Sequence, residues 1–265
     1  MIAILPGGLE LAYDDVGSGI PLLFIHGWPH DRTLWAAQLS GLPTQARCLA
    51  PDLRGFGDSS VLPPYSIDQY ADDMAAFLAM LGIDRAVVCG LSMGGYVALA
   101  MLRRHRALLR GLILTSTRAT ADTPEAREKR ARLIEFVQER GVEALAGRQL
   151  KAMVGATTLN TRPDVLEALR QLMAEAPSAG VIGGLQAMAA RADATSLLSG
   201  IDFPTLVVSG SEDTFILPDE MRALAAAIPR SRLEVIQCGG HVCSYERPAA
   251  FNHVVSEFLA SLLYD

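Results

Sequence analysis

Gly90-Leu91-Ser92-Met93-Gly94 decides the fold, because this G-x-S-x-G stretch joins two segments of different character. The apolar run at 86–89 before it is typical of a buried strand, whereas residues 95–105 after it show helical spacing. Glycine two positions before and after the serine leaves room for a sharp turn, in which a strained backbone exposes the serine Oγ. The stretch therefore predicts a nucleophile elbow with Ser92 as the nucleophile.

Short apolar runs alternate with helical patterns along most of the chain. Such alternation predicts an α/β fold, a doubly wound and mostly parallel sheet with helices on both faces and an antiparallel opening pair. The expected strands cover residues 9–13, 21–25, 47–51, 86–89, 111–115, 205–209 and 232–236, and the expected helices cover 33–41, 66–81, 95–105, 217–228 and 247–263.

The alternation stops in the segment 119–199, which offers only helical stretches separated by glycine and proline. We therefore predict a core formed by residues 1–118 and 200–265, with a helical cap inserted after the sixth strand. Three methionines in this insertion, Met153, Met173 and Met188, are expected to line the substrate pocket, because a flexible thioether adapts to varied apolar partners. His30 is expected to reach the same pocket from a core loop.

A serine nucleophile needs a base and a group that orients the base. His241 lies on the glycine-rich loop after the expected strand at 232–236, and Asp213 lies in the loop after the preceding strand. The chain order Ser92, Asp213, His241 is the order expected for an elbow on a doubly wound sheet. Glu212 and Asp219 are the competing acids.

The oxyanion of an acyl-transfer reaction needs fixed N–H donors. Met93, directly after the nucleophile, offers one backbone N–H, and Trp28 in the loop His26-Gly27-Trp28-Pro29 offers the other. Pro29 has no N–H to donate. We interpret His26 as a structural residue beside a tight turn.

Composition excludes several classes of function. The 265 residues are 50% hydrophobic and carry a net charge of −6, which provides no basic patch for nucleic acid or an anionic membrane. The N-terminus shows no signal-peptide pattern, and no apolar run is long enough to span a membrane, so a cytoplasmic protein is expected. A zinc site of Cys238, His241 and Cys243 is disfavoured, because no fourth ligand is visible. We predict no metal and no cofactor, and a monomer or homodimer.

Five segments together resemble the α/β-hydrolase superfamily over nearly the whole chain: His26 to Pro29, Pro51 to Ser59, Gly90 to Gly95, Ser211 to Asp213, and Gly240-His241. The resemblance implies an eight-stranded sheet and a structural role for the second segment. Within the superfamily the chain is similar to bacterial carboxylesterases and 3-oxoadipate enol-lactonase-like proteins with a small helical cap. Dehalogenases and epoxide hydrolases are disfavoured, because their relatives have aspartate at the position of Ser92.

The expected activity is hydrolysis of small to medium, partly apolar carboxylic esters, since the acidic net charge gives no obvious steering of anions. A lactone hydrolase of the enol-lactonase type would need a cation for its substrate. The available arginines are Arg118, Arg148, Arg162 and Arg191. A perhydrolase or non-heme haloperoxidase would use the same three residues, and a non-catalytic small-ligand-binding protein on the same fold is the alternative from another class.

Overall fold

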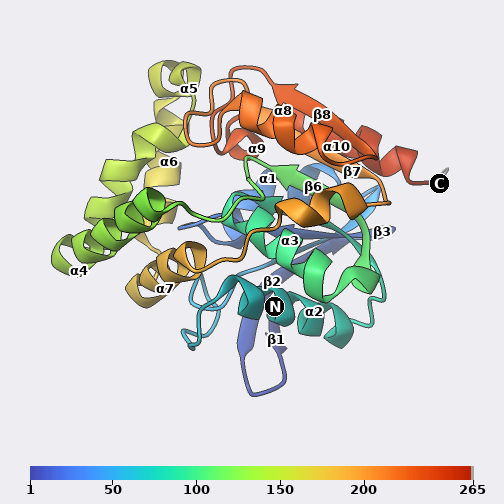
Figure 1. Cartoon of the computed structure of the whole chain (residues 1–265), viewed down its shortest axis with the longest axis horizontal. Helices are drawn as coiled ribbons and strands as arrows, with labels where there is room; N and C mark the ends of the chain where they lie inside the picture. The colour runs from blue at the N-terminus through green and yellow to red at the C-terminus, as the bar shows by residue number, and fades with distance from the viewer. Residues whose placement is uncertain (264–265) are drawn as a thin grey trace.

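The computed structural model describes residues 1–263 and is built around one eight-stranded sheet (Figure 1). The strand order is β1-β2-β4-β3-β5-β6-β7-β8, with β2 antiparallel to both of its neighbours and all later pairs parallel. The α/β fold class is therefore confirmed. The expectation that the first two predicted strands, 9–13 and 21–25, form an antiparallel pair is wrong, because β2 pairs with β1 and β4, whereas β3 lies parallel between β4 and β5. The strands are β1 (Ile2–Ile4), β2 (Glu10–Gly17), β3 (Ile20–Ile25), β4 (Ala46–Pro51), β5 (Ala86–Leu91), β6 (Leu109–Thr115), β7 (Thr205–Gly210) and β8 (Ser231–Ile236).

The central strands are rich in apolar residues because helices cover both of their faces. Every residue of β5 and β7 is buried, as expected for parallel strands inside a doubly wound sheet. The edge strand β1 differs, since Ile2 and Ile4 are exposed and only three residues pair with β2. This short strand was not among the segments expected from the sequence.

Two pairs of helices cover the sheet. Helices α2 (Ile67–Met80) and α3 (Met93–Arg104) pack together on one face, and α1 (Ala36–Gly41) and α10 (Pro248–Ser261) pack together on the other (Figure 1). The remaining core helices are α8 (Pro218–Ala226), which contacts β7 and β8, and the single turn α9 (Cys243–Glu246). The sheet thus lies between two helical layers, and the loops that follow the parallel strands lie at its carboxyl edge.

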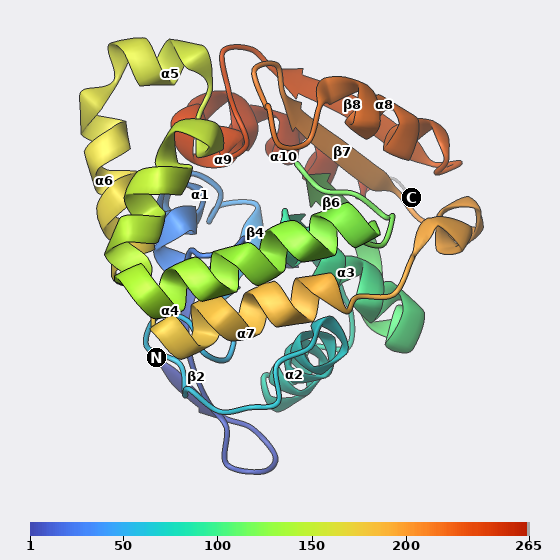
Figure 2. The same ribbon diagram turned by 60° about the vertical axis from the view of Figure 1, so that its left-hand side comes forward.

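Four helices lie between β6 and β7, in the segment for which the sequence predicts a cap. They are α4 (Pro124–Met153), α5 (Ala156–Thr161), α6 (Pro163–Ala174) and α7 (Ser178–Ala189). Helix α4 is broken at Gly141, whose φ of 80° and ψ of 173° are not helical. Figure 2 shows α4 and α7 side by side, with α6 and α5 at their outer end.

Helix α7 is hydrogen-bonded to the core through the loop that follows β3. The indole Nε1 of Trp28 donates a hydrogen bond of 2.9 Å to the backbone oxygen of Val181. At the other end of α7, the buried Arg191 pairs with Asp122 at 2.5 Å, just ahead of α4. These contacts hold α4 and α7 over the carboxyl edge of the sheet.

Candidate active site

Ser92 stands at the turn between β5 and α3, with φ of 53° and ψ of −111°. A Cβ added at Gly94 would overlap the backbone oxygen of Ile25, and one added at Gly90 would overlap the carbonyl of Gly94. The glycines are therefore needed where the turn brings backbone close to backbone. The N–H of Ser92 donates to the oxygen of Thr115 at 2.9 Å, which ties the strained residue to β6.

Backbone strain gathers at the carboxyl edge of the sheet. Within residues 1–263, the only non-glycine residues with positive φ are Ser92, Ser116 and Cys238. They follow β5, β6 and β8, and each holds a conformation that costs roughly 1–3 kcal/mol. Strain of this kind is concentrated at functional sites, so the carboxyl edge of the sheet is the candidate active site.

His241 and Asp213 meet at the same edge. The imidazole Nδ1 lies 3.0 Å from Oδ2 of Asp213, and both side chains are buried. The other carboxylate oxygen accepts the N–H groups of Phe215 at 2.8 Å and Ile216 at 3.0 Å. Burial alone would raise the pKa of Asp213, but His241 and these two N–H donors outweigh it and hold that pKa below its usual range. The carboxylate is thus kept charged beside the ring, and Nε2 of His241 is the nitrogen left for a proton donor.

The competing acids have other partners. The Glu212 carboxylate accepts the N–H of Thr157 at 2.7 Å and its hydroxyl at 2.6 Å, and these bonds lower the pKa of Glu212. Asp219 is exposed and lies 3.6 Å from Arg222 on the same helix. Asp213 is therefore the acid that the structure brings to His241.

The loop after β3 packs directly against the elbow. A Cβ at Gly27 would lie 3.2 Å from the backbone oxygen of Leu91. Among the described residues, the N–H groups of Trp28 and Met93 donate to no other protein group, although both residues are buried. Both ring nitrogens of His26 are hydrogen-bonded. Nδ1 donates to the backbone oxygen of Gly27, and Nε2 accepts the N–H of Leu53, each at 3.0 Å. Its ring braces the loop and has no free nitrogen for chemistry.

A cavity of about 570 Å³ opens above Ser92 and His241. Of the four pocket residues expected from the sequence, Met153 and Met188 line it. The lining residues, taken over residues 1–263, include neither Met173 nor His30. Met173 is fully buried on α6, which packs against α4, so this thioether serves the interior of the helical segment.

His30 is buried beneath the site instead of lining the cavity. Neither ring nitrogen has a hydrogen-bond partner within the described part of the chain. Burial, followed by the nearby charges of His26 and His241 when protonated, lowers the pKa of His30 to about 3. The ring is therefore neutral at any ordinary working pH.

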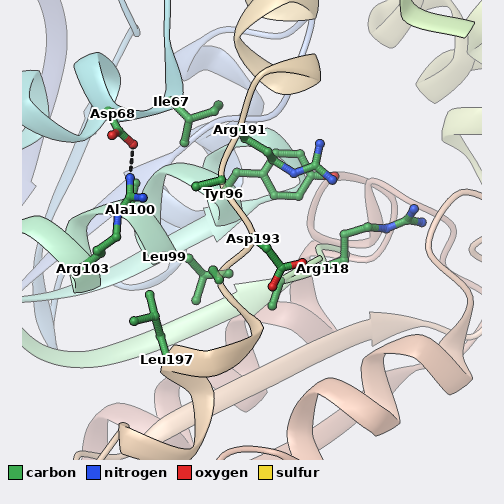
Figure 3. Close-up of a pocket in the computed structure, with 13 residues that line it drawn as sticks. Ile67, Asp68, Tyr96, Leu99, Ala100, Arg103, Arg118, Arg191, Asp193 and Leu197 are labelled. Carbon is green, nitrogen blue, oxygen red and sulfur yellow. Dashed lines mark hydrogen bonds and ion pairs between the residues drawn. The ribbon is translucent and has the colours of Figure 1, made fainter. Parts of the chain in front are cut away.

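The four arginines considered as substrate cations lie in different places. Arg118 and Arg148 line the cavity, whereas Arg162 is partly exposed and pairs with Asp164 at 2.7 Å. Arg191 is buried against Asp122, with its guanidinium 4.1 Å from the centre of the Tyr96 ring (Figure 3). Tyr96 and Arg118 also line a second cavity of only about 20 Å³, so they form the wall between the two spaces.

Glu246 was missed by sequence reasoning. Its buried carboxylate accepts the N–H of Gly240 at 2.7 Å and the N–H of Gly155 at 2.8 Å. Burial raises the pKa of Glu246. The side chain joins the histidine loop to the residue that precedes α5. Only its closeness to His241 in the sequence could have drawn attention to it.

No group of three or more histidine, cysteine, aspartate or glutamate side chains in residues 1–263 could hold a metal ion. None of the helices in that part of the chain combines the length and the apolar character needed to cross a membrane.

Comparison with known proteins identifies the family. A family model described as the alpha/beta hydrolase fold matches residues 20–248. The AB hydrolase superfamily protein YisY of Bacillus subtilis (strain 168) is 31% identical over 262 residues, covering 94% of this chain and 95% of that protein.

Two solved structures are similar over almost their whole length. A thermophilic esterase from Thermogutta terrifontis, described with malate bound, has a TM-score of 0.95 at 40% identity, covering 99% of this chain and 98% of that one. The enol-lactonase from Burkholderia xenovorans LB400 has a TM-score of 0.90 at 30% identity, covering 98% and 100%. The family match runs from β3 to the start of α10 and contains Ser92, Asp213 and His241. The chain belongs to the α/β-hydrolase fold family.

Proposed function

We propose that this protein is a serine hydrolase that cleaves carboxylic esters through an acyl-enzyme intermediate. The observation that carries the proposal is the placement of His241, which bonds to the buried Asp213 through Nδ1 and shares one cavity with the strained Ser92. A nucleophile, a base and a group that orients the base are the parts that acyl transfer requires.

In the first half of the proposed reaction, Nε2 of His241 takes the proton of the Ser92 hydroxyl as Oγ attacks the ester carbonyl. The C=O electrons move onto oxygen, and the N–H groups of Trp28 and Met93 stabilise that charge. His241 then gives the proton to the leaving alkoxide as the C–O bond breaks, which releases the alcohol. Asp213 fixes the ring and stabilises its protonated form throughout.

In the second half, water takes the place of the alcohol. His241 accepts one proton from the water as its oxygen attacks the acyl carbon, and it returns that proton to Oγ of Ser92 as the acid leaves. The net change is one ester and one water converted to one acid and one alcohol, and no cofactor takes part in these steps.

The helical segment 119–199 is proposed to act as the cap over this site. The cavity of about 570 Å³ fits small to medium substrates, and Met153 and Met188 provide flexible apolar walls. Acyl or alcohol groups of different length would therefore be distinguished by contacts with α4 and α7.

The test is hydrolysis of a series of p-nitrophenyl esters by the wild-type protein and by Ser92→Ala. We expect turnover in the wild type and a loss of at least about 1,000-fold in the variant, because the remaining groups supply only part of the rate. Retained turnover in a folded Ser92→Ala protein would show that Ser92 is not the nucleophile.

Lactone hydrolysis is a second candidate, favoured by the presence of Arg118 and Arg148 in the cavity wall. The similarity to the enol-lactonase from Burkholderia xenovorans points the same way. The chemical steps would be the same, except that the leaving alcohol stays tethered to the acyl group. A matched ester and lactone of equal carbon number would rank the two activities.

We propose a small-molecule substrate, no nucleic-acid or membrane partner, a monomer or homodimer, and a cytoplasmic location. The four free cysteines, of which three are buried, are compatible with a reducing compartment.

A further inference from the structure

The wall of the large cavity carries one sign of charge. Its lining residues include five cationic side chains, and, over residues 1–263, no aspartate or glutamate. The whole chain, in contrast, has a net charge of −6. Positive charge has therefore been concentrated around the opening of the site against the sign of the protein as a whole. The five are Arg118, Lys129, Arg130, Arg132 and Arg148.

Three of these cations are already paired. Arg118 lies 3.2 Å from Glu220, Arg130 lies 2.5 Å from Asp122, and Arg132 lies 2.6 Å from Glu128. Within residues 1–263, no ion pair involves Lys129 or Arg148, although Lys129 interacts electrostatically with the exposed Glu125 one turn before it on α4. Arg148 is thus the cation most available to an anion that enters the cavity, with Lys129 nearby in the same wall.

Arg148 is also held in place by an aromatic ring. Its guanidinium lies 4.8 Å from the centre of the Phe136 ring, and the two residues stand on opposite sides of the break at Gly141 in α4. Stacking on a ring face fixes the plane of the guanidinium while leaving its edge N–H groups free. A guanidinium fixed in this way is suited to two parallel hydrogen bonds with a carboxylate.

We infer that the substrate is an ester or lactone that carries an additional, ionised carboxylate, and that Arg148 binds this group with support from Lys129. The inference rests on the proposed acyl transfer at Ser92 and adds the charge of the substrate to it. The scissile carbonyl then lies at Ser92 and the carboxylate points toward α4. The proposed site attracts anions locally, although the net charge of the whole chain is −6.

The experiment compares two substrates of similar shape, the anionic monoethyl ester of glutarate and uncharged ethyl pentanoate. The wild-type protein should prefer the anionic ester, so that its kcat/KM for this ester is about 3 to 30 times its kcat/KM for ethyl pentanoate at low salt. The expected ratio is modest because both cations are exposed and water screens their charge. In Arg148→Gln the ratio should fall toward one, mainly through a higher KM for the anionic ester. Salt of about 0.5 M should reduce the wild-type preference, because the Debye length then becomes only a few ångströms.

The matched control is Arg162→Gln, whose arginine pairs with Asp164 outside the cavity lining. This variant should keep the wild-type ratio. Equal use of both esters by the wild type, or the same ratio in Arg148→Gln as in the wild type, would overturn the inference.

A binding measurement separates this inference from the proposed reaction. Free glutarate should bind to Ser92→Ala, in which no acyl transfer can occur, and the added Arg148→Gln change should weaken that binding about 3- to 30-fold. If the wild-type protein hydrolyses neither ester but still binds glutarate, the proposed acyl transfer is wrong and the anion site stands. Turnover of ethyl pentanoate without any effect of Arg148→Gln on glutarate binding would count against the anion site alone.

Discussion

One carboxylate oxygen of Glu246 accepts the backbone N–H of Gly240 at 2.7 Å, in the residue directly before His241. The other oxygen accepts the N–H of Gly155, so the same side chain holds the base loop and the start of α5 together. Replacing one oxygen by an amide NH₂ leaves a buried N–H facing a donor. Glu246→Gln should therefore lower the free energy of unfolding by about 1–3 kcal/mol and reduce kcat.

Urea unfolding and ester kinetics on the same preparation check this. Glu257→Gln, which changes a half-exposed carboxylate on α10, is the control and should alter neither quantity measurably. Wild-type stability and kcat in Glu246→Gln would show that the link is dispensable.

His30 gives a prediction about stability in acid. Burial is the main reason that its pKa falls from 6.5 to about 3. Between these values the unfolded chain binds a proton that the folded protein does not, so the free energy of unfolding falls as the pH drops below 6.5. At pH 5 the loss from this residue is on the order of 2 kcal/mol.

His30→Leu removes the titrating group together with its unpartnered nitrogens. The variant should match the wild type within about 1 kcal/mol at pH 8 and be the more stable protein at pH 5. Unfolding free energies at both pH values are the measurement, with the exposed His253→Gln as the control. An unchanged pH slope in His30→Leu would place the acid sensitivity elsewhere.

The three methionines of the helical segment should behave differently. Met153→Ala and Met188→Ala enlarge the cavity and should shift the preference toward longer acyl chains, by about 10- to 200-fold per methylene at most. Met173→Ala should leave the preference unchanged and cost about 2–5 kcal/mol of stability, because Met173 is fully buried outside the cavity lining of residues 1–263. A chain-length profile for each variant decides the matter, and a shift in Met173→Ala alone would contradict this assignment of the pocket wall.

Asp213 and Glu212 are neighbours with separate tasks. Asp213→Asn should lower kcat by several orders of magnitude, because an amide cannot stabilise the protonated His241 ring. Glu212→Gln should mainly weaken the hydrogen bonds to Thr157, with a smaller effect on kcat. Steady-state kinetics on both variants would reveal the opposite order if the orienting acid had been misassigned.

The sequence was most informative where the backbone itself constrains the residue type. Gly90 and Gly94 are required by contacts of the turn, so a local motif was enough to place Ser92 between a strand and a helix. Asp213 and His241 follow neighbouring parallel strands, whose carboxyl ends share one edge of the sheet. Their meeting could therefore be expected from strand order.

Features that depend on three-dimensional packing were not predictable in this way. Met173 and Met188 have the same chemistry and both lie in helices, but only the packing of α6 and α7 decides which one reaches the cavity. Net charge is an average over the surface, and it concealed the cations that α4 gathers at the site, such as Lys129 and Arg148. Glu246 acts through backbone groups distant in the sequence or hidden in loops, and these leave no pattern in the chain.

The central claim is that Ser92 is the activated nucleophile. The most direct test is to treat the protein with a fluorophosphonate and map the adduct by peptide mass spectrometry. The account predicts one equivalent of label on the peptide that contains Ser92, much slower labelling in His241→Ala, and none in Ser92→Ala. Stoichiometric labelling of a different residue, or undiminished labelling of Ser92→Ala, would contradict it.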